Sequence, residues 1–180
     1  MIVETVVTTL NPDGSVNCGA MGVEWGEQRI VVKPYRGTRT LRNLRATGAA
    51  VVNLTDDILL FSQAALGDPH PPTRPAASVE GAVLADACSW REVRVDAINE
   101  GGQRARVSTV VVDGGSGREF LGFNRACHAV LEASILASRV RMLPAEGISA
   151  ELKRLQVLVD KTGGPREREA MAYVRAAIRL

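Results

Sequence analysis

The sequence contains few aromatic residues and few cysteines. Aromatic side chains make up 4% of its 180 residues, so the core must be built mainly from Val, Leu, Ile and Ala. Cys18, Cys88 and Cys127 are the three cysteines, and no two of them form a CxxC pair. An odd, widely spaced set argues against a disulfide framework and against a structural zinc site. We expect free thiols and no metal centre.

Strong net charge and long apolar runs are also missing. The 22 basic and 20 acidic side chains leave a formal charge of +2, too little for wholesale nucleic-acid binding, so any basic site must be local. No apolar run approaches the roughly 20 residues that span a bilayer. The start MIVETVVTTL lacks the features of a secretory signal. We therefore expect a soluble, cytoplasmic protein without a membrane partner.

Most catalytic signatures are absent. The sequence has no GxGxxG after a strand, no GxxxxGK[ST], no HExxH and no GxSxG. His70 lies in a Pro-rich segment, and Cys127 and His128 are neighbours on an expected helix, where adjacent side chains point about 100° apart. The catalytic residues are therefore unknown from the sequence. Any difficult chemistry would have to come from a bound cofactor.

The first two thirds of the chain favour short strands, which alternate in hydrophobicity or are rich in Val and Thr. In the predicted strand 89–98, for example, we expect Val93, Val95 and Ala97 to lie on the same face. The predicted strands are 2–10, 16–25, 29–33, 49–54, 89–98 and 104–113, and residues 113–117 are predicted to turn.

Two short helices are predicted within this β-rich part. The first, 40–47, has Leu41 and Leu44 on one face and ends at Gly48, which suits a left-handed cap. The second follows a cap at Thr55 or Asp56 and runs to about residue 66. Residues 67–78 carry four prolines, which predicts an irregular loop or lid.

The last third of the chain changes to a helical period. A long helix is predicted from Asn124 to about Leu143, followed by helices at 149–161 and 165–179. Pro165 suits the first position of the last helix. Antiparallel strands followed by helices predict an α+β barrel.

The segment Tyr35-Arg36-Gly37-Thr38-Arg39-Thr40, just before a helix, combines cations, hydroxyls and helix-start amides. These are the groups that bind a phosphate monoester, and Lys33 adds a further charge. In an alternative interpretation, Thr38 or Thr40 only caps the helix and the arginines form a solvated face. We prefer this alternative for Arg42 and Arg45, and both interpretations stay open for the 36–40 segment.

The predicted strand around Ala20-Met21-Gly22-Val23 is rich in small residues. Small residues in a strand mark a close approach to the backbone, although a bulge at a barrel corner would use them equally well. A flat ring along this strand, with its phosphate at Arg36, Thr38 and Thr40, would account for both unusual segments.

Five segments taken together resemble a known family: ETVVTT (4–9), NPDGSVNCGAMGV (11–23), KPYRGTRTLRNL (33–44), VVNLTDD (51–57) and FNRACHAVLEASILASRV (123–140). The sequence resembles an uncharacterised archaeal and bacterial family of the FMN-binding split-barrel superfamily, which also contains flavin reductases and pyridoxamine-phosphate oxidases. The resemblance implies an α+β fold with an antiparallel split barrel over 1–123. The helices of 124–180 would pack on the barrel within one compact domain and contribute to a homodimer.

The resemblance also implies FMN as the cofactor, held near the subunit interface. Its phosphate would be bound by the 33–40 segment, and its ring would lie along the 20–23 strand, largely against backbone. Asn53 would approach the flavin, and Asn124 and Arg125 could reach a flavin held by either subunit. The expected cofactor-binding residues are Ala20, Met21, Gly22, Val23, Lys33, Tyr35, Arg36, Gly37, Thr38, Thr40, Asn53, Asn124 and Arg125.

The leading functional hypothesis is an FMN-dependent oxidoreductase acting on an unknown small substrate. A deazaflavin cofactor in the same fold is an alternative, with Arg39 and Arg42 meeting its longer acidic tail. A non-catalytic flavin-binding protein is another. The tail 151–180 superficially resembles a helix-turn-helix reader of DNA, but its acidic and basic residues interleave as on an ordinary surface. We therefore expect no nucleic-acid partner.

Overall fold

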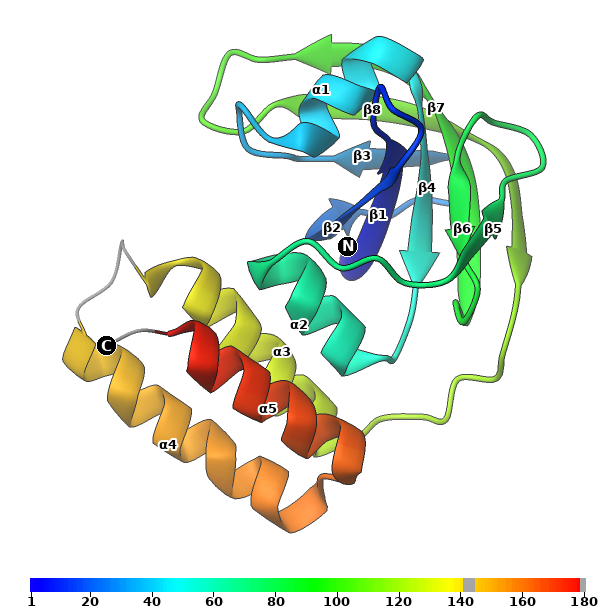
Figure 1. Cartoon of the computed structure of the whole chain (residues 1–180). Coiled ribbons are helices and arrows are strands. Elements are labelled where there is room, and N and C mark those ends of the chain that lie inside the picture. Colours follow the sequence, from blue (N-terminus) through cyan, green and yellow to red (C-terminus); the bar gives the residue numbers. More distant parts are fainter. Residues whose placement is uncertain (141–144, 179–180) are drawn as a thin grey trace. The chain divides into compact units, whose positions relative to one another are not determined.

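The computed structural model describes residues 1–140 and 145–178. The chain forms two compact units, which Figure 1 shows as a barrel and a group of helices. The barrel unit comprises Met1–Thr55 and Pro69–Glu119, and the helical unit comprises Asp56–Asp68 and Phe120–Leu180. The α+β class and the helical C-terminal part agree with the prediction from the sequence. That the two units form one compact domain stays a prediction.

Six antiparallel strands close the barrel in the order β1-β2-β3-β8-β7-β4, with β4 pairing back onto β1. Each of them overlaps a predicted strand. Their bounds are β1 (Ile2–Leu10), β2 (Val16–Glu24), β3 (Arg29–Val32), β4 (Ala49–Leu54), β7 (Ser89–Asn99) and β8 (Arg106–Ser116).

The barrel is paired unevenly around β2. On one side, β2 pairs with β1 over its whole length, from Leu10 opposite Val16 to Ile2 opposite Glu24. On the other side, within the described residues, β2 pairs with β3 only between Glu24 and Val31. Among the described residues, the second edge of β2 therefore lacks a strand partner from Val16 to Val23, although the barrel closes through the Glu24–Val31 pair.

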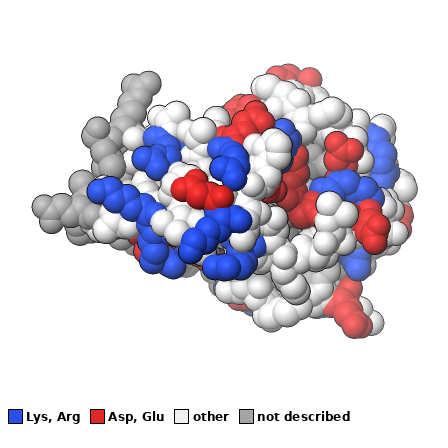
Figure 2. All heavy atoms as spheres, turned by 90° about the horizontal axis from the view of Figure 1, so that it is seen from below, with Lys and Arg blue, Asp and Glu red and all other residues white. Residues whose placement is uncertain are grey.

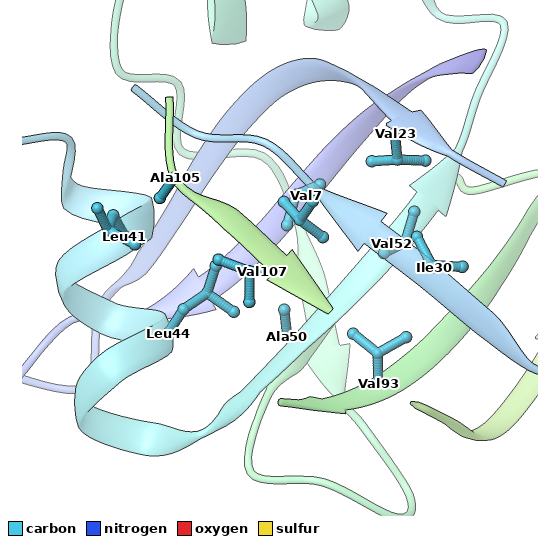
Figure 3. Packing of buried hydrophobic residues seen from close by; sticks show 11 residues of the cluster. Val7, Val23, Ile30, Leu41, Leu44, Ala50, Val52, Val93, Ala105 and Val107 are labelled. Carbon is cyan, nitrogen blue, oxygen red and sulfur yellow. The ribbon is translucent and has the colours of Figure 1, made fainter. Parts of the chain in front are cut away.

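Helix α1 (Arg39–Thr47) lies between β3 and β4 in the chain and closes one end of the barrel core. Leu41 and Leu44 point from α1 toward Val107 and its neighbours, as Figure 3 shows, and both are buried. Burying one such side chain stabilises the fold by about 2 kcal/mol. Gly48 ends the helix at φ 65°, and its N–H donates to the Leu44 carbonyl, which confirms the predicted left-handed cap.

The alternation predicted for 89–98 is wrong at its far end. The pairing of β7 with β8 shifts register between Glu92 and Val93 and again between Val95 and Ala97. The second shift reverses the faces that follow it, because a bulge adds one residue to the strand. Ala97 is therefore exposed, and Ile98 packs against the core.

The turn predicted at 113–117 is also wrong, because β8 continues to Ser116. Gly115 lies opposite Trp90 in the ladder, and a Cβ on Gly115 would lie 2.5 Å from Cζ2 of the Trp90 ring. Gly115 therefore leaves room for the indole instead of making a turn.

The Pro-rich segment is more ordered than predicted. Residues Thr73–Pro75 form β5, which pairs with β6 (Ala82–Leu84), a strand that the sequence analysis missed. The residues between them are held by Glu92, whose buried carboxylate accepts hydrogen bonds from the backbone amides of Ala77, Ser78 and Val79. From Thr73 to Val79 the segment is therefore tied to the barrel, which does not suit a mobile lid.

The helical unit contains α2 (Ile58–Leu66), α3 (Arg125–Ser138), α4 (Ala145–Thr162) and α5 (Pro165–Ala177). Asp57, rather than Thr55 or Asp56, caps α2 by accepting from the amides of Leu59 and Leu60. Asn124, where the sequence predicted the third helix to begin, is its N-cap, and the helix itself starts at Arg125. Residues 141–143 of the predicted long helix lie outside the described residues.

A buried hydrogen bond of 2.9 Å between the Ser62 and Ser134 hydroxyls links α2 to α3 inside this unit. Among the described residues, no helix is both long enough and apolar enough to cross a membrane.

Candidate functional site

The first turn of α1 has the backbone geometry of an anion site. Thr38 is the N-cap, and its Oγ1 donates to the Tyr35 carbonyl at 2.8 Å and accepts from the Leu41 amide at 3.4 Å. Arg39 and Thr40 are the first helical residues, whose amides have no acceptor within the helix. Gly37 has φ +79°, with open space where a side chain would stand. Helix starts of this kind favour negative charge.

Arg36 is the cation of this segment that is free to bind a ligand. It is exposed, and within the described residues it makes no hydrogen bond or salt bridge. Its charge acts only at long range. Together with the larger effects of the hydrogen bond and charge of Arg45, it lowers the pKa of Glu100.

Lys33 is engaged elsewhere in the barrel. Its ammonium group forms an ion pair with Glu24. The same carboxylate also accepts two hydrogen bonds from the Arg106 guanidinium, at 2.8 and 3.0 Å. Hydrogen bonds from Arg106 and then Lys33 lower the pKa of Glu24 to about 2. Lys33 would have to leave Glu24 to reach a phosphate, and its predicted contact stays a prediction.

Tyr35 contacts Arg104, a residue that the sequence analysis missed. The Arg104 guanidinium lies 4.2 Å from the centroid of the Tyr35 ring, and its Nη2 donates to the Tyr35 hydroxyl at 2.6 Å. The two residues also form an isolated β-bridge. Arg104 thus adds a cation beside the 35–38 segment. No local pattern reveals it, because the contact joins residues that are 69 positions apart.

Thr40 joins the two segments that the sequence analysis singled out. It is 4% exposed, and its Oγ1 accepts a hydrogen bond of 3.1 Å from Nδ2 of Asn17 on β2. A Cβ on Gly19 would lie 2.9 Å from the same oxygen. The small-residue strand and the first turn of α1 are therefore direct neighbours.

The side chains of the 20–23 part of β2 alternate between the barrel core and the other side of the strand. Met21 packs against the core, Val23 is fully buried within it, and Ala20 and Gly22 face the opposite side of the strand. Because this stretch pairs with no other described strand on its second edge, alternate backbone N–H and C=O groups along it can bond a ligand. Beside Gly22 the side chains of Ile2 and Glu4 fill the space, because a Cβ there would lie 2.8 Å from Cγ2 of Ile2 and 2.9 Å from Oε1 of Glu4.

Asn53 is fully buried, and both ends of its amide contact protein groups. Nδ2 donates to the Val6 carbonyl at 3.0 Å and to the Thr8 hydroxyl at 3.1 Å, and Oδ1 accepts from the Leu84 amide at 3.0 Å. Asn53 therefore ties β4 to β1 and β6. Its predicted approach to a cofactor stays a prediction.

The remaining predicted site residues, Asn124 and Arg125, belong to the helical unit. The Asn124 Oδ1 accepts from the amides of Ala126 and Cys127 as the cap of α3, and Arg125 is exposed. Their predicted contact with a cofactor also stays a prediction.

Cys127 and His128 do not act as a pair. The Cys127 thiol is directed at the Asp56 carbonyl at 3.8 Å, whereas the exposed His128 ring lies 5.8 Å from the ring of Phe123. Burial, followed by the charges of Glu167, Asp56 and Asp57, raises the pKa of the Cys127 thiol to about 11. A thiol in this state is a poor nucleophile.

Several basic residues of α4 and α5 form ion pairs with acidic side chains. Arg166 pairs with Asp57 at 2.7 Å, and Arg154 pairs with Glu151 at 2.6 Å. On the face shown in Figure 2, acidic side chains lie among the basic ones. This arrangement fits a solvated surface with ion pairs, as the sequence indicated.

Comparison with known protein families gives two matches. Residues 3–118 match the N-terminal domain, and residues 124–176 the C-terminal part, of a family described as protein of unknown function (DUF447). An FMN-bound DUF447 protein from Methanosarcina mazei is similar in structure, with a TM-score of 0.86 at 23% identity, covering 98% of this chain and 95% of the other.

More distant structures share the barrel. The styrene monooxygenase flavin reductase from Pseudomonas putida S12 has a TM-score of 0.54 at 18% identity, covering 63% of this chain and 79% of its own. A flavoredoxin from Methanosarcina acetivorans has a TM-score of 0.57 at 15% identity, covering 67% and 72%. These similarities show that the barrel has the split-barrel fold, and the family matches show that the chain belongs to the DUF447 family.

Proposed function

We propose that this protein binds FMN in its barrel unit and acts through it as an oxidoreductase on a small substrate. The observation that carries the proposal is the contact between β2 and α1, where Asn17 and Gly19 meet Thr40. A strand edge that can hold a ring thereby adjoins a helix start that can hold a phosphate. The similar protein from M. mazei is described as FMN-bound.

The residues present fit the phosphate of FMN. Arg36 is uncommitted, Gly37 lets a ligand come close to the backbone, and the first turn of α1 supplies amide donors. Charge-assisted hydrogen bonds from such groups are roughly twice as strong as neutral ones. Arg104, beside Tyr35, extends the positive surface around this turn.

The residues present also fit a flat ring. The edge of β2 offers backbone donors and acceptors, and Ala20 places only a methyl group beside them. Bound FMN would supply hydride and single-electron transfer, and the protein would orient the ring and exclude water. For that chemistry the protein would need no nucleophile or acid–base pair of its own.

We further propose that the protein is a homodimer. Phe120, Leu121 and Phe123 of the helical unit are 51%, 86% and 90% exposed, and clustered apolar surface of this kind is typical of interfaces. Light scattering should give twice the mass of one chain, and Phe123→Glu should shift the protein toward monomer. Val157→Glu, at another exposed apolar position, serves as the control. A monomeric wild-type protein would contradict this part of the proposal.

The first experiment is the visible absorption spectrum of the protein purified without added cofactor, with mass analysis of what heating releases. We expect a flavin spectrum and released FMN. Arg36→Ala combined with Thr38→Ala should abolish FMN retention while circular dichroism stays native. Arg29→Ala, which removes an exposed arginine paired with Asp96, should retain it. Unchanged FMN content in the double variant would refute the phosphate site.

The redox part of the proposal needs its own measurement. Under anaerobic conditions, NADH or NADPH should bleach the bound flavin, and an added acceptor should restore its colour. A protein that retains FMN but is reduced only by dithionite would be a flavin carrier or sensor, and the oxidoreductase assignment would be wrong.

A further inference from the structure

A cluster of buried polar side chains lies between the barrel and α1. It consists of Thr9 on β1, Asn17 on β2, and Thr40 and Asn43 on α1, and each of the four is at most 6% exposed. We call these four residues the α1 anchor. They are connected by hydrogen bonds from the two asparagine amides.

The bonds of the α1 anchor converge from two strands onto one face of the helix. Asn17 Nδ2 donates to Thr9 Oγ1 and Thr40 Oγ1, each at 3.1 Å, and Asn43 Nδ2 donates to Thr9 Oγ1 at 3.0 Å. Thr40 and Asn43 are three residues apart and therefore share a face of α1. Asn43 Nδ2 also donates to Asn11 Oδ1 at 2.9 Å, which ties the helix to the β1–β2 turn.

Burial of apolar surface alone does not explain this cluster. Leu41 and Leu44 already bury an apolar face of α1 in the core, and apolar contacts tolerate sliding and rotation because they are not directional. Hydrogen bonds among buried groups require one position and one orientation, since a missed partner leaves a polar atom unsatisfied. The α1 anchor thus fixes where the first turn of the helix stands relative to β2.

The anchor also sets the direction of the Thr40 hydroxyl. Its oxygen accepts from Asn17, and its own hydrogen donates to no acceptor in the part of the chain that the structure describes. A hydroxyl held in this way retains a donor for a further oxygen. The oxygens of a phosphate are acceptors of the matching kind.

We propose that Asn17 and Asn43 are positioning residues that preset Thr40 and the first turn of α1 for the phosphate of FMN. The inference rests on the proposed function and adds a specificity: the anchor makes the protein prefer FMN to riboflavin, which has the same ring without the phosphate. Neither asparagine needs to touch the cofactor, because both act through Thr40 and the helix.

The test compares the dissociation constants of FMN and riboflavin for the refilled apoprotein, by flavin fluorescence titration. In Asn17→Ala and in Asn43→Ala, FMN binding should weaken about tenfold or more, the size expected when a hydrogen bond to a charged group is lost or misdirected. Riboflavin binding should change little. Thr40→Val should show the same loss of preference, and Thr40→Ser should restore most of it.

Thr109→Val is the matched control, because the buried Thr109 hydroxyl donates to the Ile30 carbonyl between β8 and β3, outside the α1 anchor. This variant should be less stable than the wild type and keep its preference for FMN. If either alanine variant fails to fold, a serine at the same position retains one donor and should give an intermediate preference.

Two outcomes would overturn the inference in different ways. If the asparagine variants, alanine or serine, lose stability as Thr109→Val does but keep the wild-type preference for FMN, the anchor is only structural. If the wild-type protein binds FMN no better than riboflavin, or binds neither, the proposed phosphate site itself is wrong. The wild-type titration therefore separates failure of the proposed function from failure of the anchor.

Discussion

A Cβ atom on Gly19 would lie 2.9 Å from Oγ1 of Thr40, closer than real side chains approach. Gly19 therefore lets β2 lie directly under the first turn of α1, where Asn17 also reaches Thr40. The glycine permits the close packing that brings a strand edge and a helix start together.

Gly19→Ala should displace Thr40 and weaken FMN binding more than it destabilises the fold. The added methyl group would also lie 3.0 Å from Cε of Met21, a flexible side chain that can move away, whereas Thr40 is held by Asn17. We expect FMN affinity to fall about tenfold or more, as for the loss of a hydrogen bond to a charged ligand. Fluorescence titration measures it.

Gly147→Ala is the matched control for this substitution. A Cβ at Gly147 on α4 meets nothing within 4 Å, and alanine in a helix is favoured by about 1 kcal/mol over glycine. This control should bind FMN as tightly as the wild type and unfold at the same or a higher urea concentration than the wild type. Equal FMN affinity in Gly19→Ala and the wild type would contradict the packing argument.

Glu92→Ala should destabilise the barrel unit strongly. Glu92 is 1% exposed and accepts from three backbone amides, those of residues 77, 78 and 79. Removing the carboxylate leaves these amides without their acceptor, at a cost of about 3 kcal/mol or more. Urea unfolding measures the loss, and limited proteolysis should show new cleavage near residues 76–79.

Glu80→Ala, at an exposed position next to that segment, is the control and should change stability by less than about 0.5 kcal/mol. A Glu92→Ala protein as stable and as protease-resistant as this control would show that the carboxylate does not hold the segment.

The Glu24 carboxylate should make stability depend on pH in the acid range. Arg106 and Lys33 lower its pKa from 4.5 to about 2 in the folded protein. A lowered pKa stabilises the fold above the unfolded-state value, and that contribution is lost as the pH falls from about 4.5 to about 2. The stability difference between wild type and Glu24→Gln should be constant above pH 5.5 and shrink below pH 4.5. A difference that does not change with pH would contradict the pairing.

Cys127 should be almost inert toward alkylation at pH 8. A rise of its thiol pKa from 9.0 to about 11 lowers the thiolate fraction about a hundredfold, and the thiolate is the reacting form. Iodoacetamide labelling followed by peptide mass analysis should show little modification until the protein is unfolded in urea. Labelling of native Cys127 as fast as a free cysteine peptide would show that the thiol is more accessible than its burial indicates.

Local features of the sequence predicted most elements of the barrel. Val- and Thr-rich segments marked the strands, and Gly48 marked the end of α1, because its left-handed conformation favours glycine locally. The errors fell where distant contacts override the local pattern. Gly115 suggested a turn, but it lies in β8 because the Trp90 ring occupies the space of a side chain. The bulge before Ala97 is set by the pairing with β8.

The sequence by itself determined the chemistry that the site offers: the cation and hydroxyl of Arg36 and Thr38, the small residues of β2, and the family to which they point. Only the tertiary structure decided how these groups combine. In the folded protein, Gly19 packs against Thr40, Arg104 stacks on the Tyr35 ring and Lys33 pairs with Glu24. Arg36 has no hydrogen bond or salt bridge among the described residues. Residue types and spacing fix local conformation, but side chains far apart in the chain choose their partners only when strand pairing brings them together.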